Sequence, residues 1–168
     1  GILTDSLASF HITRASVVNL EQNDHPFEYR YSFVAPNYAK NAGGILVLRP
    51  RAVGTKSSGL LETNEARRFA VEFDGPVKDS DTFEFTLPAG YIVEDLPSSV
   101  DADFSFASYH SKSEVQGNLI RYTRTFEVKE LSVPSSRAEE LKKFYRIIDS
   151  DERNTAILKT TLHKDPAQ

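Results

Sequence analysis

Alternating apolar and polar residues run through most of this chain. The clearest case is the stretch 27–33, where an aromatic residue stands at every second position and polar residues lie between them. A period of two is typical of a strand with one covered face. The pattern therefore predicts a strand here, and it predicts further strands at residues 9–20, 45–48, 67–73, 83–87, 91–93, 104–115, 119–128 and 156–162.

One stretch has the spacing of a helix. Ser136 and Glu139 fit a capping box, which marks a helix start. Apolar residues then recur every three or four positions, at Ala138, Leu141, Phe144 or Tyr145, and Ile148. We predict an amphipathic helix over about residues 135–149, with its apolar stripe packed on the core.

Two connections are specific enough to predict geometry. Pro88, Ala89 and Gly90 predict a tight corner between two strands, with Gly90 at positive φ. Residues 116–118 predict a three-residue hairpin loop between strands 104–115 and 119–128. That loop would pair Phe106 with Val128 and His110 with Arg124, which keeps the apolar side chains of both strands on one face.

These elements predict a mainly β fold. Seven to nine strands and one late helix, with no alternation of strand and helix, exclude the doubly wound folds. We predict an antiparallel β-sandwich of about seven to nine strands, followed by the helix at about 135–149 and a last strand. The 168 residues fit one domain, 1–168. Residues 49–67 show no pattern and predict a flexible loop; loops this long are either mobile or functional.

Composition and charge exclude several classes of function but do not identify one. The net charge is −4 and the pI is about 5.6, which argues against a nucleic-acid binder. There is no cysteine, so a disulfide framework and a cysteine nucleophile are excluded. No apolar run approaches the roughly 18 residues of a membrane helix, so no membrane insertion is expected. The chain has no methionine and begins with Gly1, which suggests a fragment of a longer protein.

Motifs for known chemistry are missing. The four histidines lie far apart in the sequence and predict no metal site. They are His11, His25, His110 and His163. No cofactor is expected. Neither a phosphate-binding glycine loop between strand and helix nor a G-x-S-x-G elbow occurs. The acidic clusters 94–95, 101–103 and 149–152 fall in turns or at the helix end, where we interpret them as solvated. The sequence therefore predicts no catalytic residue.

Arg124 interrupts an apolar face in the middle of a predicted strand. In one interpretation its stem packs at an edge while the guanidinium reaches water. In the other it is a partly buried arginine paired with Glu114 or Glu127. Arg124, His110 and the neighbouring Tyr109 are the candidate binding residues.

Six segments carry a family resemblance. The most specific of them is the pattern FTLPAGYIVEDLP at residues 85–97. The six segments are residues 27–40, 43–50, 67–68, 85–97, 118–128 and 141–159. In these the chain resembles the carboxy-terminal β-rich domain of unknown function of bacterial transglutaminase-like proteins, which have a papain-like core.

The resemblance implies an accessory role. The catalytic cysteine of such a core has no counterpart here, so we expect a non-catalytic domain that contacts upstream domains of the same chain. It also implies an extracytoplasmic setting, in the periplasm or cell envelope. Two alternatives stay open. One is an independent glycan- or peptide-binding module with stacking faces on Tyr38, Tyr91 and Tyr109; the other is a hydrolase with paired carboxylates.

Overall fold

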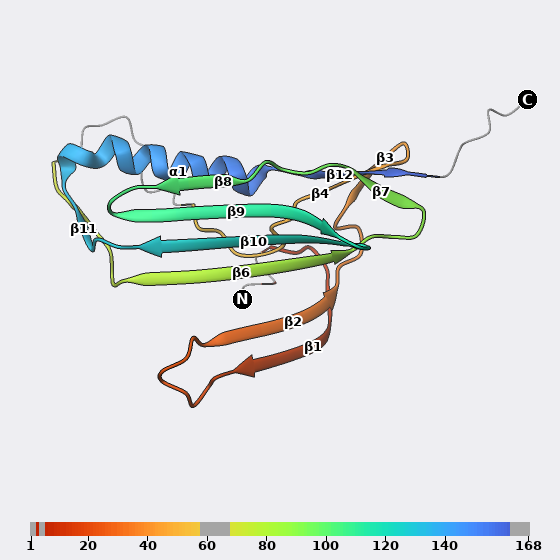
Figure 1. Ribbon diagram of the computed structural model, residues 1–168, viewed down its shortest axis with the longest axis horizontal. Helices are drawn as coiled ribbons and strands as arrows, with labels where there is room; N and C mark the ends of the chain where they lie inside the picture. Colours follow the sequence, from red (N-terminus) through yellow and green to blue (C-terminus); the bar gives the residue numbers. More distant parts are fainter. Residues whose placement is uncertain (1–2, 4–5, 58–67, 162–168) are drawn as a thin grey trace, which may run out of the picture. The chain divides into compact units, whose positions relative to one another are not determined.

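The computed structural model describes residue 3, residues 6–57 and residues 68–161. Where the sequence suggested one domain over 1–168, contacts divide the chain into two compact units, residues 1–38 and residues 39–168. The first unit contains the antiparallel hairpin of β1 (His11–Val18) and β2 (Glu28–Val34) (Figure 1). Both strands fall inside the predicted ranges 9–20 and 27–33, give or take one residue.

The second unit contains a four-stranded antiparallel sheet in the order β6-β10-β9-β8. Its strands are β6 (Val77–Thr86), β8 (Val100–Asp103), β9 (Ala107–Gln116) and β10 (Leu119–Val128). Alternate residues of the central strand β10 are buried, which is the covered face that the sequence pattern predicted. Some strand residues were missed: β8 and the first half of β6, both rich in aspartates that disfavour strands, were interpreted as polar links, and no strand was predicted at residues 40–42 and 132–133.

A second four-stranded sheet has the order β3-β4-β12-β7. It contains β3 (Lys40–Ala42), β4 (Ile45–Leu48), β7 (Tyr91–Asp95) and β12 (Ala156–Thr160). The last strand β12 pairs with β4 on one side and β7 on the other, so the end of the described chain is central in this sheet. A small ladder joins β5 (Val71–Glu72) to β11 (Ser132–Val133), where a longer strand 67–73 was predicted.

The helix packs on the first of these sheets. A short 3-10 turn η2 (Ser135–Arg137) leads into α1 (Ala138–Arg153), and Figure 1 shows the helix along the sheet beside β8. The predicted stripe is confirmed, because Leu141, Phe144 and Ile148 are fully buried. Phe144 meets the rings of Phe104 and Phe106 at centroid distances of 5.4 and 5.8 Å.

The helical region begins at Ser135 as predicted, but the predicted capping box and the predicted end are wrong. No side chain caps the N-terminus, so the capping box does not form. The helix continues past residue 149 to Arg153, since Asp151 and Glu152 find buried partners instead of ending it in solvent.

The register of the β9–β10 hairpin differs from the predicted one by one residue. Val128 lies opposite Ala107, and Arg124 lies opposite Ser111 instead of His110. The reason is the turn: Gln116 pairs with Leu119, so the loop has only the residues 117 and 118, with Gly117 at φ 61°. The phenylalanines that supported the longer loop precede β9, and Tyr109 takes the buried face in their place.

The fold class is confirmed. The described chain is mainly β, with several antiparallel sheets, one carboxy-terminal helix and a final strand. The corner at 88–90 leads from β6 in one sheet to β7 in the other, so it links the two sheets. Gly90 has φ 79°, as the turn chemistry predicted.

Replacing Gly90 with valine is expected to destabilise the fold by about 1–3 kcal/mol, because a β-branched side chain is strained at positive φ. Chemical denaturation would measure the loss. Gly75→Val is the matched control, since a Cβ at Gly75 meets nothing within 4 Å and its φ is not in the positive range. Equal stability of the two variants would contradict the assigned corner.

Candidate functional site

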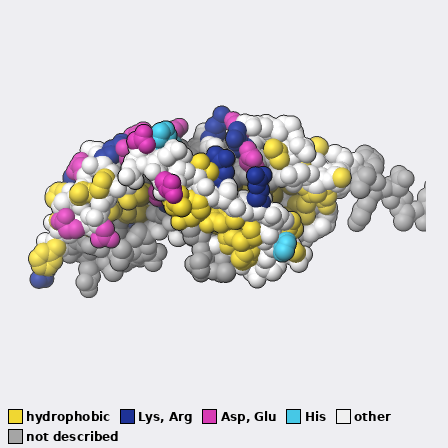
Figure 2. All heavy atoms as spheres, turned by 90° about the horizontal axis from the view of Figure 1, so that it is seen from below, with side chains coloured by type: hydrophobic (Ala, Val, Ile, Leu, Met, Phe, Trp, Pro, Cys, Tyr) yellow, Lys and Arg dark blue, Asp and Glu magenta, His cyan; other side chains and the backbone are white. Residues whose placement is uncertain are grey.

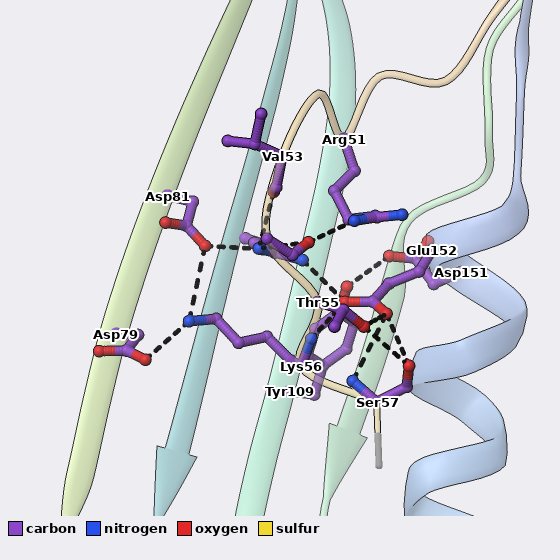
Figure 3. Close-up of polar contacts among 12 residues, drawn as sticks. Arg51, Val53, Thr55, Lys56, Ser57, Asp79, Asp81, Tyr109, Asp151 and Glu152 are labelled. Carbon is purple, nitrogen blue, oxygen red and sulfur yellow. Dashed lines mark hydrogen bonds and ion pairs between the residues drawn. The ribbon is translucent and has the colours of Figure 1, made fainter. Parts of the chain in front are cut away.

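Charged side chains gather in the interior of the second unit, a position that is unusual for them. They come from the segment 51–57, from β6 and β10, and from the end of α1 (Figure 3). We call this set the buried charge cluster after its buried centre of Arg124, Asp151 and Glu152; its other members, Arg51, Lys56, Asp79 and Asp81, are partly exposed.

Arg124 is the centre of the cluster, with a side chain only 2% exposed. Its Nε donates to Asp81 at 2.7 Å, and its Nη1 donates to Glu152 at 2.8 Å. Its Nη2 lies 3.4 Å from the carbonyl oxygens of Val53 and Gly54. Burial alone would lower the pKa of Arg124, but the charges of Asp81 and Glu152 outweigh it and raise that pKa. The guanidinium therefore stays charged, with every nitrogen directed at a protein acceptor.

Glu152 joins the helix to the segment 51–57. Its Oε1 accepts hydrogen bonds from Arg124 and from the Lys56 N–H, the latter at 2.6 Å. Its Oε2 accepts from the hydroxyls of Thr55 and Ser57 at 2.6 and 2.9 Å. Burial raises the pKa of this carboxyl, but these hydrogen bonds outweigh burial, and the pKa is lowered from its ordinary value.

Lys56 extends the cluster to the edge strand β6. Its Nζ lies 2.7 Å from Asp79 and 3.9 Å from Asp81, so two carboxylates on one face of β6 meet a cation from the 51–57 segment. Within that segment Arg51 donates to the carbonyl of Gly54. The first part of the loop predicted at 49–67 is therefore fixed by hydrogen bonds; residues 58–67 lie outside the described residues.

Two tyrosines complete the interior on the helix side. The hydroxyls of Tyr109 and Tyr122 both donate to Oδ2 of Asp151, at 2.6 and 2.9 Å. Burial, reinforced by the bond to Asp151, raises the pKa of Tyr109 strongly. Burial also raises the pKa of Tyr122, to about 12, against an opposing effect of its contact with Tyr109. These hydroxyls act as donors that hold the carboxylate of Asp151 inside the fold.

Titration of Tyr122 is expected to occur near pH 12 in the folded protein. Because this pKa is raised above the unfolded value of about 10, the stabilising contribution is complete below pH 10 and is lost as the pH rises toward 12. The tyrosinate absorbance of the native protein minus that of Tyr122→Phe isolates this group. A midpoint near pH 10, with the fold intact, would contradict the buried hydroxyl.

The three candidate residues from the sequence do not meet. Tyr109 and Arg124 both belong to this interior, but His110 points to the opposite face of the sheet. There its Nδ1 lies 2.9 Å from Asp101, and its Nε2 lies 3.4 Å from Asp103. Tyr109 is fully buried, so it cannot supply the stacking face suggested for a glycan.

The cluster corrects two further interpretations. Arg124 does not reach water, and its partners are Asp81 and Glu152, not Glu114 or Glu127. Asp151 and Glu152 are 5% and 3% exposed, so they are not solvated end-of-helix carboxylates. One signal was available in the sequence: Arg124 shares its parity with Ile120, Tyr122, Phe126 and Val128, which are all buried.

Most polar atoms of this cluster already have protein partners, which limits the chemistry that it can perform. A general acid among paired carboxylates needs a raised pKa, whereas that of Glu152 is lowered. In the described residues no group of three or more His, Cys, Asp or Glu side chains is arranged to hold a metal ion. Pairing in the cluster is not complete, because Oδ1 of Asp151 is buried without a hydrogen-bond partner.

The surface carries mixed charge and some apolar side chains. Figure 2 shows one face, on which basic and acidic side chains lie close together and hydrophobic side chains reach solvent. Among the described residues, one surface hollow is lined by Arg14, Ser16, Arg30 and Ser32, and another lies where α1 ends beside the end of β7. Neither contains a member of the buried charge cluster. Among the described helices, none combines the length and the apolar character needed to cross a membrane.

Comparison with known proteins gives a family and a fold. The family model for a domain of unknown function with solved structure (DUF3858) matches residues 45–158. The crystal structure of a putative protease from Parabacteroides distasonis is similar in fold, with a TM-score of 0.55 and 13% sequence identity. The similarity covers 73% of this chain but 24% of that protein, so the chain spans about a quarter of its length. No curated protein matches the chain.

Proposed function

Since the chain belongs to the DUF3858 family of domains of unknown function, we propose that it is a non-catalytic accessory domain of a longer protein with a protease-like or transglutaminase-like core. The observation that carries this proposal is the unequal coverage: 73% of this chain corresponds to 24% of the larger protein described as a protease. A segment that forms a quarter of a larger chain, and has compact sheets of its own, is typical of one domain among several.

The buried charge cluster supports a structural role for this domain. The nitrogens of Arg124 and the oxygens of Glu152 are directed at protein partners, so they have little capacity left for a substrate. Instead they join β6, β10, α1 and the 51–57 segment, which are far apart in the sequence. A domain fixed in this way presents a rigid surface, as an accessory domain that positions or stabilises a neighbour requires.

The transglutaminase-like association and an extracytoplasmic setting form the finer part of the proposal. Both rest on the sequence resemblance at 85–97 and the other matching segments. The family description and the similar crystal structure are compatible with them.

The test compares the longer protein with a version that lacks residues 39–168. Peptide hydrolysis, amine incorporation and the melting temperature of the core are measured for both. We expect the shortened protein to lose activity or several degrees of stability, and residues 1–168 alone to catalyse neither reaction. A core that is unchanged without the domain would contradict an accessory role. Turnover by residues 1–168 alone, or binding of that fragment to peptidoglycan, would support the hydrolase or the glycan-binding module instead.

A further inference from the structure

The hairpin of β1 and β2 has one apolar face that is open to solvent. Tyr29 lies opposite Val17, and Tyr31 lies opposite Ala15, so these side chains share a face. Phe27 continues the row: its ring centroid is 4.6 Å from that of Tyr29, which is 6.1 Å from that of Tyr31. Tyr29 is 55% exposed and Tyr31 is 42% exposed. We call this surface the aromatic face of the hairpin.

The opposite face of the same hairpin is polar. Arg14, Ser16, Arg30 and Ser32 line a hollow there, and Arg30 is paired with Glu28 at 2.7 Å. A two-stranded hairpin with one polar and one apolar face is marginally stable in water by itself, and it normally covers the apolar face. The aromatic face is therefore suited to a contact and the polar face to solvent.

We propose that the aromatic face packs against an apolar surface of a neighbouring domain of the longer protein, an inference that rests on the proposed accessory function. The hairpin lies before residue 45, where the family match begins, and it forms a compact unit of its own. It therefore lies outside the part of the chain that defines the family.

The size of the face favours a partner in the same polypeptide over a second copy. The three aromatic side chains, about half exposed and of roughly 200 Å² each, offer on the order of 300 Å². A specific interface between separate molecules buries about 800 Å² on each partner. A contact within one chain does not lose the translational and rotational freedom that separate molecules lose, so a smaller apolar area is sufficient.

The experiment measures amide hydrogen exchange of β2 in the longer protein and in residues 1–168 alone. Exchange in 28–34 is expected to be at least tenfold slower in the longer protein. Tyr31→Glu and Ser32→Glu form a matched pair, because adjacent residues of β2 point to opposite faces. Tyr31→Glu should abolish that protection in the longer protein, and Ser32→Glu, beside Arg14 and Arg30, should leave it unchanged.

Each other outcome overturns the inference. Equal exchange in both proteins would mean that no domain covers the face. Protection in residues 1–168 alone would place the cover within this chain, or on a second copy if the protection rises with protein concentration. Protection that appears only with added peptidoglycan would identify a glycan platform. Amide exchange in β2 could be equal in both proteins while the activity or stability of the core still depends on residues 39–168. In that case the proposed accessory function would stand, and only the hairpin contact would be wrong.

Discussion

Arg124→Met is expected to destabilise the second unit by about 3–5 kcal/mol, because it removes the guanidinium from the buried carboxylate of Glu152 and from the partly exposed carboxylate of Asp81. Asp81 and Glu152 both lie within 2.8 Å of the guanidinium. Methionine fills a similar volume, so the loss of stability would come mainly from the missing charge and not from a cavity. Urea denaturation of residues 1–168 measures the change.

Arg121→Met is the matched control for this variant. Arg121 lies on the same strand, three residues earlier, and its ion pair with Glu84 at 3.2 Å is on the solvent side, with the arginine side chain 40% exposed. Such an exposed pair contributes less than about 1 kcal/mol. If both variants lose similar stability, then Arg124 is not the centre of a buried cluster.

Glu152→Gln is expected to cost about 3 kcal/mol, although the two side chains have nearly the same shape. The amide retains one acceptor oxygen, and its NH₂ group would face donors from Thr55, Lys56, Ser57 or Arg124. Removing the charge also leaves Arg124 only partly neutralised. Glu140→Gln, at an exposed ion pair with Arg137 on the same helix, should leave stability almost unchanged.

The pH dependence of the same group gives an independent measurement. The pKa of Glu152 is lowered below its ordinary 4.5 in the folded state. Its contribution is therefore fully present above pH 4.5 and is lost as the pH falls through the lower, folded value. Native protein should lose more stability between pH 5 and pH 3 than Glu152→Gln does. Parallel stability curves for the two proteins would contradict a lowered pKa.

The sequence correctly predicted the elements whose buried face is set by the spacing of their own apolar residues. The helix stripe at Leu141, Phe144 and Ile148 and the alternation along β10 needed no knowledge of their partners. The corner at Gly90 was equally local, because turn chemistry requires positive φ there.

The buried charge cluster depends on partners that no local pattern identifies. Asp79 and Asp81 lie in a strand that pairs with β10, and their charges meet Lys56 and Arg124 from two other segments. The sequence showed that Arg124 interrupts an apolar face, but Glu152, its buried partner, looked like a helix-end residue exposed to solvent. The hairpin register failed for a related reason: a loop of two residues and a loop of three fit the same sequence, and packing of Tyr109 decides between them.

The cluster explains how a chain without disulfides joins distant segments. The 51–57 segment has no strand or helix, yet Glu152 accepts hydrogen bonds from Thr55, Lys56 and Ser57. Arg124 adds the edge strand β6 through Asp81. These bonds attach β6 and the 51–57 segment, neither of which contributes a described residue to the apolar core around Phe144.

The central claim is that Arg124 and Glu152 stabilise the fold as a pair, and a double-mutant cycle tests it most directly. The free energy of unfolding is measured for the native protein, Arg124→Met, Glu152→Gln and the double variant, all within residues 1–168. A buried pair predicts that the double variant loses at least about 1.5 kcal/mol less than the sum of the single losses. Additive losses, with a coupling energy near zero, would contradict the claim.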